Sequence, residues 1–351
     1  MSTESLGHRI SRWLWRGRGP LAGLARGLLL PVALLYRVAV TVRTRLYHAG
    51  ILRSVRLPLP TVAVGNLSLG GAGKTPVAAW IAGYAVQHRL RPGVLLRGYG
   101  GDEPLVHQRL VPQAIVVADP DRAAGAAAAA AKGAQLLVLD DAYQHLGVRR
   151  DLNVLLVAVE RARQARWPFP AGPWREGWSA MERADVIVVT RKRAAQDESR
   201  ALADAVARRW PRTPVCVAHL RLSGFQGMRS GTAFTPAELA GRRVFACAGV
   251  ADPESFGVQV RGTGAAVQLA SYQDHHRYDD ADVVRLVRAA RESDYVVVTE
   301  KDAVKLRPRW PADAPEPLVA VLGVQWEWNG AAFTRALDAV LAEAGRPSTG
   351  S

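Results

Sequence analysis

Cysteine is scarce in this chain, whose 351 residues include only Cys216 and Cys247. Each cysteine lies within a short apolar run, PVCVA or VFACAG, where a thiol is usually buried and unreactive. No cysteine or histidine pair has the spacing of a zinc site. The composition therefore excludes a disulfide-stabilised fold and a cysteine-based metal centre, and it indicates a protein of a reducing compartment.

Acidic residues are nearly absent from residues 1–101, which contain fourteen basic side chains and a single acid, Glu4. The whole chain has a net charge of +15, so the remaining 250 residues are close to neutral. Such a segment favours an anionic partner: phospholipid headgroups, nucleic acid or a phosphorylated substrate. No DNA- or RNA-binding motif accompanies the charge, so we do not predict a nucleic-acid partner.

Long apolar runs are also lacking near the N-terminus. The longest uncharged run there is Gly27 to Tyr36, shorter than the roughly 20 residues of a membrane span. No small-residue cleavage site follows it, which argues against a signal peptide. Tryptophan and leucine residues are instead interleaved with arginines over residues 13–45, which predicts a basic amphipathic helix in the membrane interface. The alternative is a helix that packs on the protein's own core, with its arginines extended into solvent.

Short, continuous apolar runs recur along the chain with helix-like stretches between them. They include TVAV, GVLL, AIVV, LLVLD, NVLLV, VIVVT, PVCVA, VFACAG, YVVVTE and PLVAVLG. Continuous rather than alternating apolar runs are typical of parallel strands covered on both faces. The pattern predicts an α/β protein, and the length allows two domains, each with its own core.

A glycine-rich stretch, SLGGAGKTP, follows the first of these runs and precedes a helix-like one. It nearly fits the G-x-x-x-x-G-K-[ST] phosphate-binding pattern, with Ser68 in place of the first glycine. Lys74 would reach the outer phosphates, and the Thr75 hydroxyl could hold magnesium. An ordinary glycine-rich turn is disfavoured by this strand–loop–helix context, and because only five of the 46 basic residues are lysines. The predicted nucleotide-binding residues are Ser68, Leu69, Gly70, Gly71, Ala72, Gly73, Lys74 and Thr75.

Acidic pairs follow two of the predicted strands. Asp140 and Asp141 end the run QLLVLDD, where a P-loop protein carries its second magnesium anchor. Asp102 and Glu103 follow a glycine-rich turn in LLRGYGGDEP, and neighbouring carboxylates are stable where cations or hydrogen bonds relieve their repulsion. The alternative for each pair is an ordinary solvated loop.

Two further stretches bear on the chemistry. In YQDHHRYDD, His275 and His276 precede a helix-like segment, and a histidine suits the role of a base near neutral pH. A polar helix-entry loop is the alternative. The stretch VVVTEKDAVKL is similar to the guanine-reading [NT]-K-x-D box, but Glu300 stands where that box has lysine. We therefore do not predict guanine specificity.

The ordered set GNLSLGGAGKTP, RGYGGDEP, LDDAYQH, PAGPWRE, AGVADPESF, DHHRY and TEKDAVK resembles the tetraacyldisaccharide 4′-kinases of lipid A synthesis. The resemblance runs from the N-terminal apolar segment to about Lys305. That family's P-loop also has serine or threonine where Ser68 stands. Two departures are the missing insertion before Asp102 and the replacement of the more usual DDGFQH by DDAYQH.

The resemblance implies an ATP- and Mg²⁺-dependent kinase that phosphorylates the 4′-hydroxyl of a tetraacyldisaccharide 1-phosphate to give lipid IVA. It implies that Lys74 and Thr75 hold ATP and Mg²⁺, and that Asp140 and Asp141 also hold the metal. It assigns Asp102 and His275 to a dyad that takes the proton from the sugar hydroxyl, with His276 as the neighbouring alternative. The other implied site residues are Glu103, Arg122, Gln144, His145, Arg175 and Glu176.

The implied architecture is a P-loop NTPase-type parallel sheet domain, a second, smaller α/β domain and an N-terminal membrane-associating helix. The predicted division is a membrane-docking segment over residues 1–60, a P-loop kinase core over 61–155, the second domain over 156–330, and a C-terminal helix with a disordered tail over 331–351. The predicted partners are the lipid substrate and an anionic membrane surface, at the cytoplasmic face of the bacterial inner membrane. No protein partner is indicated. The rival functions are a P-loop GTPase or metal-chaperone NTPase without a lipid substrate, and a membrane-tethered scaffold that binds nucleotide and transfers nothing.

Overall fold

The computed structural model describes residues 10, 13–15, 17, 19–98, 101–274 and 276–345. The chain divides into two compact units, each described here by itself. The P-loop unit contains the described residues of 6–99, 107–219 and 326–351, and the small unit contains those of 100–106 and 220–325. The predicted boundary after residue 155 falls inside a strand, Leu152–Ala158. That strand and the next two along the chain pair with one another in parallel.

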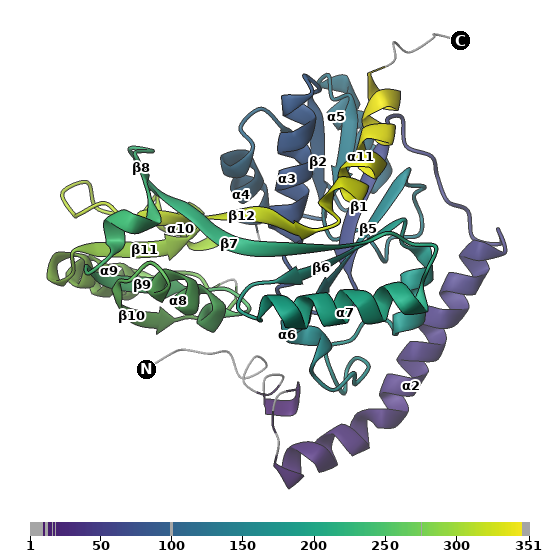
Figure 1. Ribbon diagram of the computed structural model, residues 1–351, viewed down its shortest axis with the longest axis horizontal. Helices are drawn as coiled ribbons and strands as arrows, with labels where there is room; N and C mark the ends of the chain where they lie inside the picture. The colour runs from purple at the N-terminus through teal and green to yellow at the C-terminus, as the bar shows by residue number, and fades with distance from the viewer. Residues whose placement is uncertain are drawn as a thin grey trace. The chain divides into compact units, whose positions relative to one another are not determined.

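A parallel sheet forms the P-loop unit, with strand order β7-β6-β5-β1-β4-β2-β3 (Figure 1). The strands are β1 Thr61–Asn66, β2 Pro92–Leu96, β3 Ile115–Ala118, β4 Leu136–Leu139, β5 Leu152–Ala158, β6 Val186–Arg191 and β7 Val215–Gly227. Every residue of β1, β2 and β4 is buried. Burial of successive residues requires cover on both faces, so the prediction of a covered parallel sheet is confirmed.

Helices pack on this sheet through small or branched side chains. They are α3 Lys74–Gln87, α4 Glu103–Leu110, α5 Arg122–Ala131, α6 Val159–Ala162, α7 Gln196–Arg209 and α11 Gly330–Ala344, with a 3₁₀ turn at Trp178–Arg183. The alanine-rich α5 places Ala126 and Ala129 against leucines of β2 and β4, and α7 packs Ala203 and Val206 against β6. The division between the units falls within α4, after Val106.

The N-terminal helix α2, Pro20–His48, is 29 residues long. At 1.5 Å per residue it measures about 43 Å, more than the roughly 30 Å of a hydrocarbon core. Of the helices in the described ranges, it alone is long and apolar enough to cross a membrane. The uncharged run in the sequence underestimated this length, because the helix continues through arginines on both sides of it.

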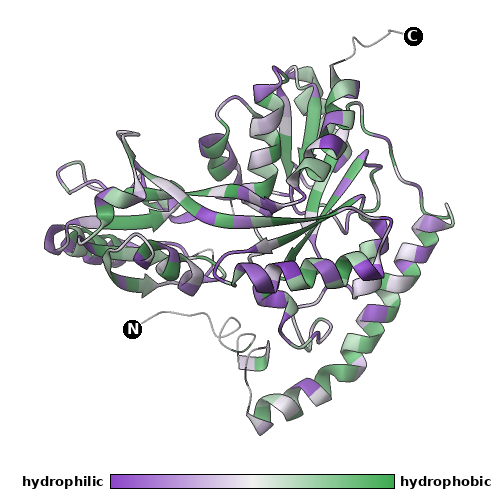
Figure 2. Cartoon of the chain, viewed as in Figure 1, coloured by the Kyte–Doolittle hydropathy of each residue, from purple (hydrophilic) through white to green (hydrophobic). Residues whose placement is uncertain are grey.

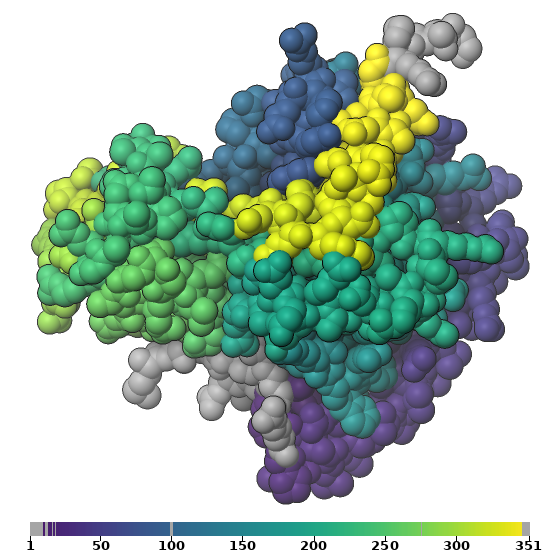
Figure 3. Space-filling view, viewed as in Figure 1, coloured from purple at the N-terminus to yellow at the C-terminus, as the bar shows by residue number. Residues whose placement is uncertain are grey.

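Many residues of α2 are hydrophobic (Figure 2), and the helix lies at the surface of its unit (Figure 3). Leu24, Leu28 and Leu35 are 65%, 74% and 70% exposed, whereas the buried residues of the helix are Ala22 and Ala33. The helix contacts its own unit through polar and aromatic groups instead: Arg43 Nη1 donates to the Gln144 carbonyl at 3.3 Å, and the Tyr36 ring lies 5.4 Å from that of Phe169. This burial pattern is the opposite of a helix packed on the core.

The small unit contains parallel strands in the order β10-β9-β11-β12, as expected for a second, smaller α/β domain. Its strands are β8 Ala233–Phe234, β9 Arg243–Ala248, β10 Ala266–Ser271, β11 Tyr295–Thr299 and β12 Leu318–Trp328; β8 pairs antiparallel with the end of β7. Its helices are α8 Pro253–Arg261, α9 Asp280–Glu292 and α10 Glu300–Leu306, with a 3₁₀ turn at Pro236–Leu239. Cys247 lies in its core and Cys216 in that of the P-loop unit, both as free buried thiols, as predicted.

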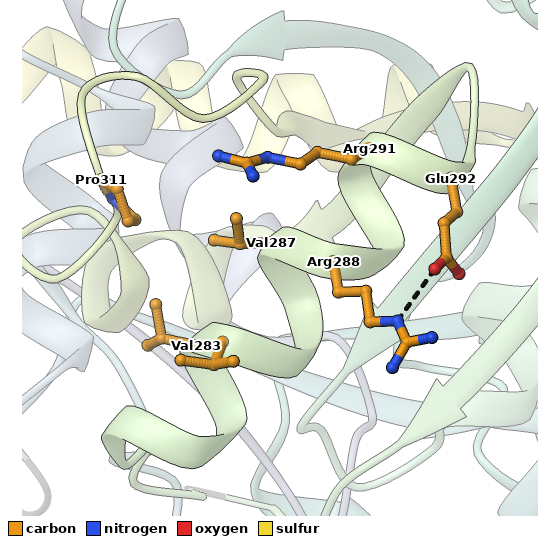
Figure 4. A pocket seen from close by; sticks show the side chains of 7 residues that line it. Val283, Val287, Arg288, Arg291, Glu292 and Pro311 are labelled. Atoms are coloured by element: carbon orange, nitrogen blue, oxygen red, sulfur yellow. Dashed lines mark hydrogen bonds and ion pairs between the residues drawn. The ribbon is translucent and has the colours of Figure 1, made fainter.

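The outer side of α9 bears an open hollow (Figure 4). Val283, Val287 and Pro311 form its apolar part, and Arg288 and Arg291 extend beside it. Both arginines are already paired, Arg288 with Glu292 at 2.9 Å and Arg291 with Asp313 at 3.3 Å. The hollow contains none of the side chains that the sequence predicts for the site.

Candidate active site

The P-loop connects the buried strand β1 to helix α3. Gly70 and Gly73 have φ angles of 107° and 88°, in the left-handed region that glycine adopts without strain. A Cβ at Gly70 would lie 2.5 Å from Nη2 of Arg161, so the end of that arginine side chain would have to move to admit it. The Asn66 amide donates to the Ser68 carbonyl at 2.6 Å and fixes the entry to the loop. The predicted strand–loop–helix arrangement is therefore present.

Lys74 begins α3, and its ammonium lies between two acceptors. Nζ donates to Asn66 Oδ1 at 3.3 Å and lies 3.5 Å from Asp141 Oδ1. Asp141 itself has a φ of 52°, which aspartate tolerates better than most residues. Both terminal nitrogens of Arg175 donate hydrogen bonds to the same carboxylate, at 2.9 and 3.2 Å. Burial would raise the pKa of Asp141, but the charges of Lys74 and Arg175 outweigh it and lower the pKa below its ordinary value.

Asp140 ends β4 and is buried beside the P-loop. Its Oδ2 accepts hydrogen bonds from the Thr75 hydroxyl at 3.3 Å and from Nε2 of His107 at 3.0 Å. Its Oδ1 is also buried and has no hydrogen-bond partner among the residues that the structure describes. Burial would raise the pKa of Asp140, yet the hydrogen bond from His107 and the charge of Lys74 lower it, so the carboxylate is ionised at neutral pH.

These atoms fit a magnesium site. A buried, ionised carboxylate oxygen without a hydrogen-bond partner is costly unless a cation or water completes its coordination. The adjacent Thr75 hydroxyl adds a second hard oxygen ligand of the kind that Mg²⁺ prefers.

Gln144 and Arg122 extend this cluster, and His145 follows Gln144 in the chain. Gln144 donates to the Asn66 carbonyl at 2.8 Å and accepts from Arg175 at 3.3 Å. Arg122, at the start of α5, is buried and donates to the Asp140 carbonyl at 3.3 Å. His145 is partly buried, and this burial together with the charges of surrounding arginines lowers its pKa, which favours the neutral imidazole.

Glu176 pairs with Arg183, a residue that the sequence did not predict for the site. Its two oxygens lie 2.9 and 2.7 Å from Nη2 of Arg183, and both side chains are nearly inaccessible. The Arg183 guanidinium also lies 5.0 Å from the centre of the Tyr143 ring, whose hydroxyl donates to the Ala180 carbonyl at 2.6 Å. The family's usual phenylalanine has no hydroxyl at this position, and the hydroxyl of Tyr143 is accommodated by its hydrogen bond to Ala180.

Asp102 and Glu103 belong to the small unit and face lysines of α10. Asp102 is 4% exposed, and its Oδ2 lies 3.2 Å from Nζ of Lys305. Glu103 lies 3.9 Å from Nζ of Lys301, one helical turn earlier. A cation beside each carboxylate relieves the repulsion between the two acids, as predicted from their adjacency.

His275, the predicted base, lies outside the described residues. Its neighbour His276 is buried, and its Nε2 lies 2.7 Å from Oδ2 of Asp282. The His276 ring packs between those of Tyr272 and Tyr278, with centroids 4.7 and 4.9 Å away. His276 is therefore part of the packed core of this loop.

Among the side chains that contact predicted site residues, Lys305 and His107 were not themselves predicted. Lys305 lies in the TEKDAVK stretch, where the rarity of lysine in this chain was the available signal. His107 carried no comparable signal, since a lone histidine in an apolar helix is usually a core residue. Both contacts join segments far apart in sequence, which local patterns do not reveal.

A comparison with protein families matches residues 25–342 to the tetraacyldisaccharide-1-P 4′-kinase model. Among curated proteins, the tetraacyldisaccharide 4′-kinase of Pelobacter propionicus is 38% identical, over 80% of this chain and 82% of the relative. The protein of the same name from Anaeromyxobacter sp. (strain K) is 35% identical, over 95% of this chain and 96% of the relative.

A solved structure supports the same relationship. The Aquifex aeolicus LpxK structure in complex with ATP superposes with a TM-score of 0.71 at 25% identity, and the match covers 90% of this chain and 99% of that one. The fold, the family match and the identities to named relatives agree. This chain belongs to the tetraacyldisaccharide 4′-kinase family.

Proposed function

We infer that this protein is an ATP-dependent kinase that phosphorylates the 4′-hydroxyl of a tetraacyldisaccharide 1-phosphate, giving lipid IVA in lipid A (lipopolysaccharide) biosynthesis. It is a phosphotransferase with an alcohol group as acceptor. Family membership supports the substrate and the position of transfer. In this chain, the observation that carries the inference is the cluster of Lys74, Thr75, Asp140 and Asp141 around one P-loop.

The P-loop cluster suits the donor side of the reaction. Phosphoryl transfer passes through a loose transition state that spreads negative charge over the equatorial oxygens, so fixed positive groups accelerate it. Lys74 supplies such a group, and its ammonium is held by Asn66 and Asp141. Arg175 brings a second cation to the same carboxylate. ATP in the Aquifex aeolicus relative supports ATP as the donor.

We assign Mg²⁺ to Thr75, Asp140 and Asp141. The buried Oδ1 of Asp140 and the nearby Thr75 hydroxyl support this assignment, whereas the carboxylate of Asp141 is shared with two cations. A bound Mg²⁺ would neutralise charge on the phosphates during transfer. The protein's contribution is to hold the ligand oxygens ionised and oriented.

On the acceptor side, we assign Asp102 and His275 to the dyad that takes the proton from the 4′-hydroxyl. The burial of the Asp102 carboxylate, its pairing with Lys305, and the engagement of His276 with Asp282 support this choice of residues. We place Glu103, Arg122, Gln144, His145 and Arg175 around the reacting groups, and we give Glu176 the role of fixing the PAGPWRE loop through Arg183.

For localisation, we propose peripheral attachment at the cytoplasmic face of the bacterial inner membrane. The exposed leucines of α2 and the basic character of residues 1–101 support contact with an anionic lipid surface. The lipid substrate is itself held in such a surface by its acyl chains, so attachment would bring enzyme and substrate together.

The alternative is an NTPase of the GTPase or metal-chaperone type, which hydrolyses nucleotide without a lipid acceptor. The [NT]-K-x-D similarity favours it least, because Glu300 replaces the lysine and is the first residue of α10. ATP hydrolysis that does not depend on lipid would distinguish this function from a kinase.

Removing the P-loop ammonium tests the proposal. Lys74→Ala should lower kcat for transfer to the lipid by roughly 10²-fold or more, the usual effect of deleting one group that stabilises transition-state charge. Lys132→Ala, which removes an exposed lysine of the same unit at the end of α5, is the matched control and should retain wild-type kcat. A Lys74→Ala enzyme with more than about a tenth of wild-type kcat would contradict the assignment.

A further inference from the structure

His107 lies outside every motif that identifies the family chemistry, yet it contacts the predicted magnesium anchor. It is in α4, five residues after Asp102, and its side chain is completely buried. Its Nε2 lies 3.0 Å from Oδ2 of Asp140. The two residues are 33 positions apart in sequence, so the fold brings them together.

The position of the proton between His107 and Asp140 follows from the chemistry of the two groups. An ionised carboxylate only accepts hydrogen bonds, so Nε2 of His107 carries the proton and donates it to Oδ2. The Thr75 hydroxyl approaches the same Oδ2 at 3.3 Å. Both described hydrogen bonds to the side chain therefore engage one oxygen, and Oδ1 is left buried without a hydrogen-bond partner in the described part of the chain.

Such an arrangement fixes the rotation of a carboxylate. A donor on one oxygen alone sets the plane of the group and directs the other oxygen to a ligand, as outer hydrogen bonds do for metal ligands generally. An aliphatic residue at position 107 could fill the same volume, but it would leave this donor out. Packing and hydrogen bonding are thus separable at this position.

We propose that His107 is a positioning residue for magnesium: it donates to Oδ2 of Asp140 and so presents Oδ1 to the metal that accompanies ATP. This inference rests on the proposed assignment of Asp140 to Mg²⁺. It adds a residue of α4 to the metal site, and that residue acts through Asp140 and not as a metal ligand.

Calorimetric titration of the full-length protein tests the proposal without turnover. The measured quantity is the ratio of the Kd for ATP in EDTA to the Kd for ATP in saturating Mg²⁺. His107→Leu should lower this ratio by roughly 10- to 100-fold, the usual effect of removing an outer hydrogen bond to a metal ligand, with the Kd in EDTA unchanged. His107→Gln, whose amide can donate from a similar distance, should restore the ratio. In kinetic assays, the leucine variant should need more Mg²⁺ for half-maximal rate and approach wild-type kcat at saturation.

Two controls separate the possible failures. Val111→Ala loosens the buried end of the same segment without touching Asp140, so the ratio should stay at the wild-type value even if the melting temperature falls. Asp140→Asn should bring the ratio close to one, because Mg²⁺ would no longer strengthen ATP binding. If the ratio stays at the wild-type value, the assigned metal site is wrong. If the ratio falls to about one in Asp140→Asn but keeps its wild-type value in His107→Leu, only the role of His107 is overturned. The role of His107 would also be overturned if His107→Gln lowered the ratio as much as His107→Leu does. The same holds if Val111→Ala lowered it by an equal amount, because packing would then explain the result.

Discussion

At the scale of residues, the site depends on oppositely charged groups that the fold holds close together. Asp141, in its left-handed backbone conformation, places one carboxylate within reach of both Lys74 and Arg175. Because these contacts exist within the fold, little reorganisation is needed when phosphate charge arrives. In the small unit, Lys305 does the same for the buried carboxylate of Asp102.

The proposed dyad gives the sharpest prediction at this scale. Asp102→Ala and His275→Ala should each lower kcat by roughly 10²- to 10⁴-fold, the range for a positioned acid–base group, with little change in the KM for ATP. If Asp102 orients His275, the double variant should be no slower than the slower single variant, because residues that act as a unit are not additive. His275→Ala should also lose the acidic limb of the rate–pH profile, since that limb reports protonation of the base.

A carboxylate elsewhere in the small unit controls for charge. Asp280 is exposed and pairs with Arg309 at 2.9 Å, so Asp280→Asn should leave kcat unchanged. His276→Ala is a poor control, because it would empty a buried ring position between two tyrosines. Losses that multiply in the double variant would show that Asp102 and His275 act independently, contrary to the dyad.

At the scale of elements, α2 differs from the other helices in where its apolar side chains lie. Arginine and tyrosine side chains contact the P-loop unit, whereas the leucines are exposed. The contact of Arg43 with the Gln144 carbonyl also places this helix against a segment that carries predicted site residues. A helix with that distribution is suited to a lipid surface that its leucines can enter.

Vesicle cosedimentation tests this role of α2. Replacing Leu24, Leu28 and Leu35 by serine should weaken binding to anionic vesicles by at least tenfold, because each leucine removed from the lipid forfeits about 1.5–3 kcal/mol of apolar burial. The control is Val258→Ser with Val284→Ser, which removes exposed apolar side chains from the small unit and should leave binding unchanged. Added salt should weaken wild-type binding, since headgroup attraction is screened. Binding that resists both the α2 substitutions and salt would contradict the proposal.

The elements themselves show how far local pattern extends. Continuous apolar runs located the buried strands of both units, because burial on both faces leaves a plain signature. They ended β7 and β12 too early: β7 continues to Gly227 and β12 to Trp328. In these extensions polar residues pair with each other, as Arg221 does with Gln325 at 2.9 Å, and the pairing partner lies about a hundred positions away in the sequence.

The candidate site divides in the same way. Its P-loop, Asp140 and Asp141 could be predicted, since each follows a strand within one short stretch. His107 on Asp140 and Lys305 on Asp102 could not, because those pairs form only when distant segments meet.

At the scale of the whole molecule, the charge and the chemistry point to one kind of substrate. Nearly all of the net charge of +15 is contributed by the segment that contains α2 and the P-loop. A phosphorylated lipid, a nucleotide and an anionic membrane each match that charge, and a kinase of the tetraacyldisaccharide 4′-kinase family would encounter all three. An NTPase without a lipid substrate would use the P-loop but would leave the exposed leucines of α2 unexplained.

The most direct measurement follows the phosphate itself. The purified protein is incubated with γ-labelled ATP and tetraacyldisaccharide 1-phosphate, with GTP in a parallel reaction, and the labelled products are separated and the position of the new phosphate is determined. The account predicts label on the 4′-oxygen of the lipid, dependent on added lipid, with ATP as the preferred donor. Label released as inorganic phosphate at the same rate with or without the lipid would contradict it.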